Sequence, residues 1–383
     1  MERSSSHRIR RLKGEKNMLK EILASRDYLP ILKMNDGRDV NQSLWQERRA
    51  ELLDALQKYS YGYTPESLGE GTGEIIFRTE YSYANKVIEE HINISFETPN
   101  GKFTVYTELF IPRFVEKPPV FLNLAFGRAP HKYLPIEEIT DQGFALMVVC
   151  YKDIVNDNLF GDYSDGLALA FGTDNPRKPD EWGKIGMWAY GASRVLDYLL
   201  TREDIDSAHT AVIGHSRLGK TALWAGAQDE RFWCTISNNS GYGGAASSKH
   251  GTGERVMDFI RVGSWDWYCE NFKEFTDEKE DSKPYDQSYL LALVAPRFLC
   301  VGSSELDRGA DPTSEFLTTM HASVAWELLG EKGLIAEDRL PTPGDHFAEG
   351  KIGYHLRPHQ HFFSRQDWNT YIKFIKEKLA ENK

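Results

Sequence analysis

The spacing of apolar residues predicts that the chain begins with helices and continues into antiparallel strands. Within residues 15–60, apolar side chains recur at helical intervals at Trp45, Leu52, Leu53, Leu56 and Tyr59. Glycines at positions 69, 71 and 73 close this section. Polar and apolar residues then alternate from about residue 74 to residue 112, most clearly in Ile92–Thr98 and Thr104–Ile111, which is typical of antiparallel strands.

Beyond residue 118, short apolar runs alternate with longer amphipathic stretches. Five runs have the length and composition of parallel strands covered on both faces: Val120–Phe126, Phe144–Tyr151, Thr210–Ser216, Cys234–Ser240 and Arg297–Ser303. The clearest helix is expected at Ile185–Leu200, where apolar residues form one stripe. This order predicts an α/β fold, with a mixed, mostly parallel sheet between helices on both faces. We expect residues 1–73 to form a mainly helical region packed on a main domain of residues 74–383, as one structural unit.

Composition narrows the classes of partner. The formal net charge of −11 gives no broad basic surface for nucleic acid, and no apolar run approaches the roughly 18 residues of a membrane span. The basic start of the chain, residues 1–23, lacks the apolar core of a secretory signal, so we expect a solvated leader. Four cysteines, Cys150, Cys234, Cys269 and Cys300, are too few for a disulfide framework. Three of them lie in or beside apolar strand-like runs, where buried thiols are expected, and a reducing cytoplasm fits this pattern best.

The strongest candidate for chemistry is Ser216. The apolar strand Thr210–Ile213 runs into Gly214-His215-Ser216-Arg217-Leu218-Gly219-Lys220, and a helical stretch follows. A serine on a tight strand-to-helix turn is what a nucleophile elbow requires. The G-x-S-x-G pattern is missed by one place, because Leu218 takes the second glycine position and Gly219 follows it.

Two cations follow this serine. Arg217 offers a backbone N–H at the helix N-terminus and a guanidinium to a developing oxyanion, and Lys220 lies one helical turn further on. Cations at a helix N-terminus oppose the helix dipole. The pattern therefore favours a functional serine over a turn that is merely structural.

At these residues the sequence resembles the glucuronoyl esterases, carbohydrate esterase family 15, and especially their bacterial, acetylxylan esterase-like members. The serine segment Gly214–Phe232 carries the resemblance, and later blocks follow in the same order: Ser237–Ala246, Ala292–Arg297, Ala310–Pro312, Gly353–Arg357 and Asp367-Trp368. The resemblance implies an α/β-hydrolase fold and a serine carboxylester hydrolase that uses no cofactor and no metal.

The resemblance also implies roles for single residues. Ser216 would be the nucleophile, Arg217 an oxyanion stabiliser and Lys220 a ligand for sugar hydroxyls, while the base falls on His361, shortly before Asp367-Trp368. A histidine late in the chain also fits the order of α/β-hydrolase triads. Its competitors are His346, His355 and His359. A metal site at His355, His359 and His361 is disfavoured, because Gly353 and Pro358 argue against a helix and no Cys or carboxylate completes the ligands.

The acid of the triad has two candidates. Asn239 stands where some family members carry an acidic residue, and an amide cannot supply the carboxylate. The loop after the strand at 297–304 is the usual place for the acid in this fold. There Asp307 best matches the family's alternative aspartate, and Glu305 is the second candidate. Asp311 is expected to cap a helix that starts near Thr313.

Several further positions bear on the substrate. By the resemblance, Glu254 and Trp267 correspond to sugar contacts, although a surface glutamate and a core tryptophan need no such role. Gly309 stands where many glucuronoyl esterases carry a stacking tryptophan, whose loss removes a large apolar contact. Tyr242 replaces a small residue and is expected to narrow or remodel the pocket. A second oxyanion donor is expected in Gly127-Arg128-Ala129, where Arg128 is either a ligand for a substrate carboxylate or an exposed loop residue.

We therefore expect a serine esterase that acts on a glucuronoyl ester or an acetylated sugar through Ser216, His361 and Asp307. Its partner would be a small-molecule or oligosaccharide ester. Two alternatives stay open. One keeps the triad but acts on a peptide, lactone or small xenobiotic ester, and the other is a catalytically silent homologue that only binds a sugar. The sequence makes no prediction of the oligomeric state.

Overall fold

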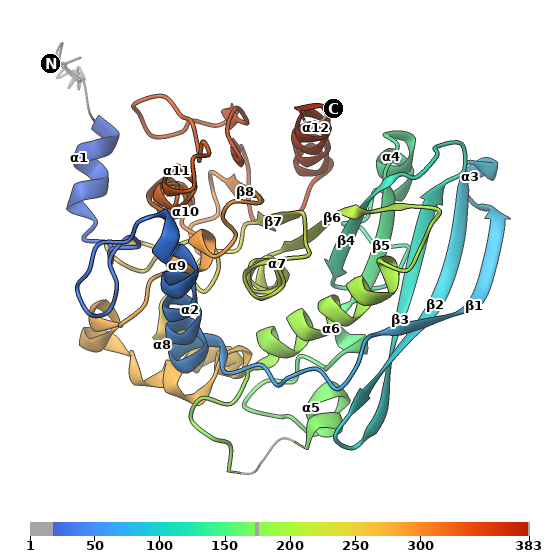
Figure 1. Ribbon diagram of the computed structural model, residues 1–383, viewed down its shortest axis with the longest axis horizontal. Helices are drawn as coiled ribbons and strands as arrows, with labels where there is room; N and C mark the ends of the chain where they lie inside the picture. The colour runs from blue at the N-terminus through green and yellow to red at the C-terminus, as the bar shows by residue number, and fades with distance from the viewer. Residues whose placement is uncertain (1–17, 173–175, 382–383) are drawn as a thin grey trace, which may run out of the picture.

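The computed structural model describes residues 18–172 and 176–381 (Figure 1). Residues 1–17 of the predicted leader lie outside the described residues. The prediction is wrong for its last part, residues 18–23, which begins the helix α1 (Met18–Ser25): Leu19 is buried, and its backbone N–H donates to the Asp338 carboxylate (2.7 Å). Ten strands form one sheet in the order β1-β2-β3-β5-β4-β6-β7-β8-β10-β9. The strands are β1 (Thr72–Tyr81), β2 (Val87–Thr98), β3 (Gly101–Pro112), β4 (Pro119–Ala125), β5 (Ala145–Cys150), β6 (Asp206–His215), β7 (Cys234–Asn238), β8 (Phe298–Ser304), β9 (His346–Phe347) and β10 (Ile352–Arg357).

The sheet is mixed and mostly parallel, as predicted. Strands β1, β2 and β3 pair antiparallel, and β3 joins β5 in the antiparallel sense. From β5 through β4, β6, β7 and β8 to β10, every neighbouring pair is parallel. The carboxyl ends of these six strands therefore meet at one edge of the sheet, where ligands bind in open α/β sheets.

Helices cover both faces of the sheet. The α-helices of the described residues are α1 (Met18–Ser25), α2 (Trp45–Leu56), α3 (Ser82–Asn85), α4 (Ile136–Asp141), α5 (Gly166–Phe171), α6 (Lys184–Leu199), α7 (Arg217–Gln228), α8 (Val256–Val262), α9 (Gln287–Ala292), α10 (Pro312–Ala322), α11 (Val324–Leu328) and α12 (Arg365–Glu381). Helix α6 is the amphipathic helix that the sequence predicted, and it lies beside α7 (Figure 1).

Alternate residues of the central strands enter two separate cores. In β4, Val120 and Leu122 belong to a cluster with α6 and α7, whereas Phe121 belongs to a second cluster with α4 and α12. The ring of Phe121 meets that of Trp368 edge to face at 5.4 Å. Because both faces of the strands are buried, the prediction of a three-layer sandwich is confirmed.

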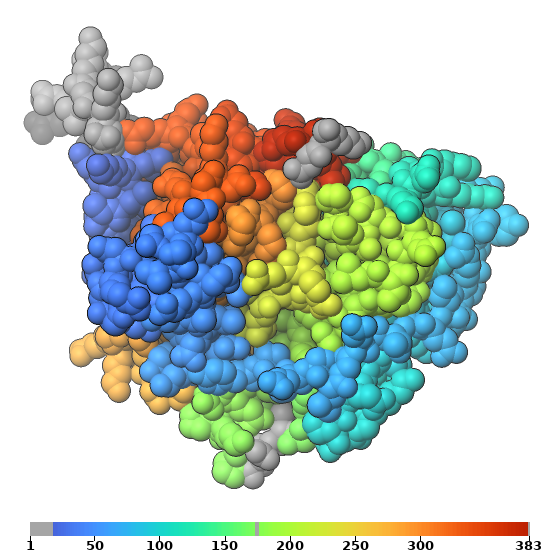
Figure 2. All heavy atoms as spheres, viewed as in Figure 1, coloured from blue at the N-terminus to red at the C-terminus, as the bar shows by residue number. Residues whose placement is uncertain are grey.

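The prediction of a helical start is only partly correct. Residues 26–41 form a loop between α1 and α2, where Pro30 and the turn at Gly37 (φ 91°) interrupt the helical pattern. The described N-terminal region, residues 18–71, packs closely on the rest of the chain (Figure 2). The Arg49 guanidinium donates to the Ala227 carbonyl (2.6 Å), and the Tyr61 hydroxyl donates to the Gly243 carbonyl (2.9 Å). The predicted division after residue 73 falls just inside β1 and stays a prediction.

Two expectations from composition can be compared with the structure. All four cysteines are free and buried, which includes the three expected to be buried in or beside apolar runs. In the described part of the chain, no helix combines the length and the apolar character needed to cross a membrane.

Candidate active site

Ser216 occupies the sharp turn between β6 and α7. Its backbone has φ 59° and ψ −128°, a strained conformation for any residue but glycine, and its N–H donates to the Asn238 carbonyl on β7 (2.8 Å). A Cβ on Gly214 would lie 2.1 Å from the Leu218 carbonyl oxygen, and one on Gly219 would lie 3.1 Å from the Asn238 oxygen. The close approach to β7 thus falls on position 219 rather than 218, which explains the displaced glycine of the sequence motif.

The Arg217 side chain is held in place by an aspartate that the sequence did not single out. Its guanidinium pairs with Asp157 and lies over the Trp267 ring, 4.5 Å from the ring centroid. The Trp267 indole N–H donates to the other oxygen of Asp157 (2.7 Å). Trp267 is 8% exposed, so its visible role is to fix Asp157 and Arg217. Arg217 is also the first residue of α7, where a backbone N–H has no partner within the helix.

The structure brings His361 and Asp307 together. His361 Nδ1 lies 2.5 Å from Asp307 Oδ2, and Asn239 donates its amide N–H to the same oxygen (2.8 Å). Burial opposes ionisation of Asp307, but the hydrogen bonds from His361 and Asn239 outweigh it and lower the pKa of Asp307. Asn239 thus supports a neighbouring carboxylate instead of supplying one. Glu305, the alternative acid, is exposed on the same loop.

The other histidines are placed for different tasks. His355 is buried on β10 and bonds Asp367 (2.9 Å), so it and His361 face different carboxylates. His346 lies in β9, where burial lowers its pKa to about 4, and His359 is exposed with φ 79°. Among the described residues, no group of three or more His, Cys, Asp or Glu side chains is arranged to hold a metal ion.

Two of the three predicted sugar ligands, Lys220 and Glu254, line the same cavity as Ser216, whereas Trp267 does not. Lys220 is buried, and its ammonium donates to the carbonyls of Ser240 and Tyr242 (both 2.6 Å) and to Glu254 Oε2 (3.3 Å). These partners use the three N–H groups of Lys220, so it fixes the loop at 240–242 and anchors Glu254, whose side chain is 41% exposed. A direct sugar contact is therefore easier for Glu254 than for Lys220.

Two substrate-related expectations need correction or refinement. Tyr242 does not narrow the pocket, because its buried ring packs against Phe259 and Phe272 and its hydroxyl binds Lys283 (2.8 Å). At Gly309, by contrast, a Cβ would meet no atom closer than 3.9 Å. The space beside Glu254 that a stacking ring would fill is therefore open.

Two cavities meet at Ser216 and His361, which line both of them. The first, here called the aromatic cavity, has a volume of 330 Å³ and is also lined by Phe126, His131, Lys132, Tyr133, His215 and Arg217. The second, the polar cavity, has a volume of 150 Å³ and is also lined by Lys220, Asn239, Ser240, Glu254, Asp307, Gly309 and Ala310. The nucleophile and base candidates thus share a junction between an apolar and a polar compartment.

The loop after β4 offers fewer free groups than expected. Arg128 forms a two-point ion pair with Asp153 (2.7 and 3.0 Å), which favours the interpretation as a structural loop residue. The Ala129 N–H donates to Glu108 (2.7 Å), so a second oxyanion donor from this loop would be the amide of Gly127 or Arg128. Asp311 caps α10 as predicted, since its carboxylate accepts from Ser314 N (3.0 Å).

Sequence reasoning also missed Glu315 and His131. Glu315 is fully buried on α10 and accepts from the amides of Ser240 and Gly241 (both 2.9 Å) and from the Ser303 hydroxyl (2.6 Å), and burial raises its pKa to about 8. It supports the loop beside Asn239. His131 lines the aromatic cavity, and burial lowers its pKa. Neither residue lies in a motif, so the sequence held no signal for them.

Comparisons with known proteins agree on one family. A family model described as glucuronyl esterase of fungi matches residues 177–330. The carbohydrate esterase MZ0003, from an unknown prokaryotic organism, is 34% identical over 90% of this chain and 88% of its own length. A 4-O-methyl-glucuronoyl methylesterase from Wolfiporia cocos is 27% identical over 77% of this chain and 70% of its own.

Solved structures extend the similarity to the whole fold. A glucuronoyl esterase from Solibacter usitatus has a TM-score of 0.83 and 32% identity, and the match covers 91% of this chain and 97% of that one. A promiscuous esterase of carbohydrate esterase family 15 from a marine bacterial metagenome has a TM-score of 0.80 and 33% identity, with 91% and 96% covered.

Proposed function

The chain belongs to carbohydrate esterase family 15, the glucuronoyl esterases, and is a carboxylic ester hydrolase; we propose that it cleaves its ester through Ser216, His361 and Asp307. One observation carries this proposal. The His361 imidazole is bonded to Asp307 through Nδ1 (2.5 Å) and lines the same two cavities as Ser216. A proton on Nδ1, donated to the Asp307 carboxylate, leaves Nε2 free to accept the proton of Ser216.

Acyl transfer then follows from these positions. His361 Nε2 takes the Ser216 hydroxyl proton as Oγ forms a bond to the ester carbonyl carbon, and Asp307 stabilises the resulting imidazolium. His361 returns the proton to the departing alkoxy oxygen, which leaves as an alcohol and gives an acyl-enzyme. Water, deprotonated by His361, attacks the acyl carbon, and the free acid leaves as Ser216 regains its proton.

Arg217 supplies the main charge for the oxyanion. Its backbone N–H lies at the start of α7, and its guanidinium is fixed between Asp157 and the Trp267 ring. Donors that are already in place need no reorganisation when negative charge develops on the carbonyl oxygen. Asp157 and Trp267 therefore contribute by holding Arg217 in position.

We propose a carbohydrate ester as the substrate, with a glucuronoyl ester as the first choice. Glu254 and the open space at Gly309 place hydrogen-bonding groups and room for a ring in the polar cavity, while the aromatic cavity suits an apolar alcohol. The names of the fungal relatives, 4-O-methyl-glucuronoyl methylesterases, support the acyl group. The open platform at Gly309 also admits other acyl groups, such as acetylated sugars.

A substrate panel tests the proposal. Methyl and benzyl glucuronate esters, acetylated xylooligosaccharides and p-nitrophenyl esters would be offered to the wild type, to Ser216→Ala and to Ser207→Ala, a control at the far end of β6. We expect the glucuronate esters to have the highest kcat/KM, with hydrolysis lost only in Ser216→Ala. Faster cleavage of acetylated sugars would replace the glucuronoyl ester by an acetyl ester as the proposed substrate. A panel without Ser216-dependent turnover would refute the proposed role of Ser216 in ester hydrolysis.

A further inference from the structure

A buried arginine holds the loop that carries His361. Arg357 is the last residue of β10 and is 3% exposed. Its Nη1 donates to the Pro358 carbonyl (3.0 Å), and its Nη2 donates to the carbonyls of Gln360 (3.0 Å) and Phe362. One guanidinium therefore binds three carbonyl groups, on both sides of His361 in the chain.

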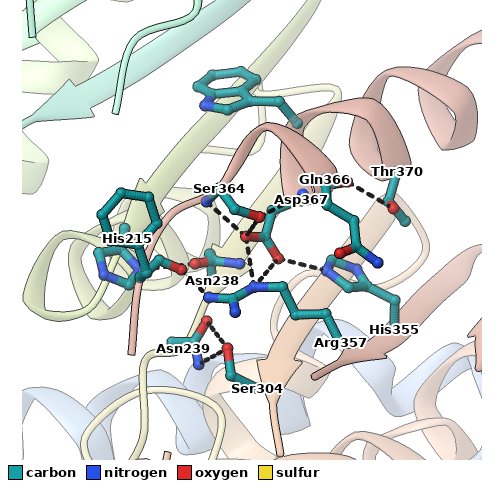
Figure 3. A network of polar contacts seen from close by, with 12 residues as sticks. His215, Asn238, Asn239, Ser304, His355, Arg357, Ser364, Gln366, Asp367 and Thr370 are labelled. Atoms are coloured by element: carbon teal, nitrogen blue, oxygen red, sulfur yellow. Dashed lines mark hydrogen bonds and ion pairs between the residues drawn. The ribbon is translucent and has the colours of Figure 1, made fainter. Parts of the chain in front are cut away.

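The arginine is itself fixed by Asp367 on α12. Arg357 Nε donates to both carboxylate oxygens of Asp367 (3.0 and 2.8 Å), and His355 contacts the same carboxylate from β10 (2.9 Å) (Figure 3). Ser364 and Asp367 form a reciprocal cap at the start of α12: the Ser364 amide donates to Asp367 (2.8 Å), and the Asp367 amide donates to the Ser364 hydroxyl (3.2 Å). Asp367 thus ties the end of β10 to the start of α12.

The segment between these two anchors has little structure of its own. Residues 358–364 belong to no helix or strand, and His361 is the member whose side chain reaches Asp307. The carbonyls on either side of His361 face the Arg357 guanidinium. The His361 side chain is instead 43% exposed and lines the aromatic cavity beside Ser216. A planar guanidinium with five N–H donors can bind Asp367 and three carbonyls at once, whereas an ammonium has three donors at one point.

We propose that the Arg357–Asp367 pair positions the general base, in addition to any contribution it makes to stability. Neither residue lines the aromatic or the polar cavity, so both act through the loop at 358–364 and are positioning residues. This inference rests on the proposed function, because it assigns a role through His361. It goes beyond that function by placing the control of His361 geometry at the junction of β10 and α12.

The substitution Arg357→Lys separates positioning from stability. It keeps a cation beside Asp367 but cannot reach all three carbonyls. We expect kcat on methyl glucuronate ester to fall about 10- to 100-fold, because a displacement of the base by about 1 Å has effects of that size. KM should stay within about twofold, because no cavity residue is altered. The rate of fluorophosphonate labelling at Ser216 should fall in parallel, since it depends on the same base.

His355→Gln is the matched control. His355 contacts the same buried carboxylate as Arg357 but contacts no carbonyl of the 358–364 loop. The His355→Gln substitution should lower the melting temperature. Its kcat, per active site counted by fluorophosphonate labelling of a separate sample, should stay within about twofold of the wild type. If Arg357→Lys does not fold, Asp367→Asn takes its place, with an expected loss in kcat of about tenfold.

The outcomes are distinct. A folded Arg357→Lys variant with wild-type kcat, or a His355→Gln variant that loses kcat as strongly as Arg357→Lys at equal loss of stability, would overturn the positioning role. If the wild type itself shows no Ser216-dependent hydrolysis, the proposed function fails instead. A fall in kcat confined to the Arg357 and Asp367 variants supports the inference.

Discussion

The substitution Asp307→Asn should remove the charge beside His361 while it keeps the hydrogen bond. In the wild type, Asp307 Oδ2 faces His361 Nδ1 (2.5 Å) and also accepts from the Asn239 amide (2.8 Å). That second donor directs the introduced amide oxygen toward His361. The imidazole therefore keeps its proton on Nδ1, and the main change is the loss of the carboxylate charge that stabilises the imidazolium in the transition state.

The size of the effect follows from Coulomb's law. With about 4 Å between the charge centres and an effective dielectric constant of about 20 to 40, the interaction is about 2 to 4 kcal/mol. The upper part of that dielectric range applies because His361 is 43% exposed. The interaction is then about 2 to 3 kcal/mol, and the corresponding fall in kcat is about 30- to 200-fold.

The assay compares kcat for Asp307→Asn with that for Glu305→Gln on methyl glucuronate ester. Glu305 is the exposed carboxylate two positions earlier on the same loop, so its loss should change kcat by less than about twofold. A reversed order, with Glu305→Gln severely impaired and Asp307→Asn nearly intact, would refute the assignment of the acid.

Three further predictions concern the surroundings of the site. Gly309→Trp should lower KM for a glucuronate ester about three- to tenfold, because a Cβ there meets nothing closer than 3.9 Å and a ring contact contributes about 0.5 to 1.5 kcal/mol; an unchanged KM argues against a sugar at this position. Asp157→Asn should lower kcat about tenfold with little change in KM, since Arg217 loses the carboxylate that orients it. Steady-state kinetics measures both values, and an unaltered kcat would contradict this role of Asp157. Although burial opposes ionisation of Asp367, contacts with His355 and Arg357 lower its pKa from 3.8 to about 2, which stabilises the fold by about 2 kcal/mol above about pH 4. This contribution should be lost as pH falls from about 4 to 2, and urea unfolding of Asp367→Asn should lack that pH dependence.

The central part of the fold could be predicted from the sequence because it rests on local apolar runs. The run at 210–216 and the stripe at 185–200 became β6 and α6 with shifts of a few residues at most. Strand β10 was not predicted, because Gly353, His355 and Arg357 interrupt its apolar pattern. Its two polar side chains are compensated by Asp367, a partner that only the folded chain brings near.

The site shows the same division between local and distant information. The turn at Ser216 is encoded by its own neighbours, Gly214 and Gly219, and was visible as a motif. Asp157 approaches Arg217 from a loop 60 positions away, and no spacing in the sequence marks that contact. Lys220 looked free in the sequence because the carbonyls that bind it belong to the loop at 240–242.

Covalent labelling of Ser216, the proposed nucleophile, tests the proposed mechanism most directly. The protein would be treated with a fluorophosphonate, and portions would be withdrawn over time. In each portion, hydrolysis of methyl glucuronate ester would be measured first, and the protein would then be digested and analysed by mass spectrometry. We expect one label per chain, on Ser216, with activity lost in proportion to labelling. A label on another residue, or full hydrolysis by a chain completely modified at Ser216, would contradict the proposed mechanism.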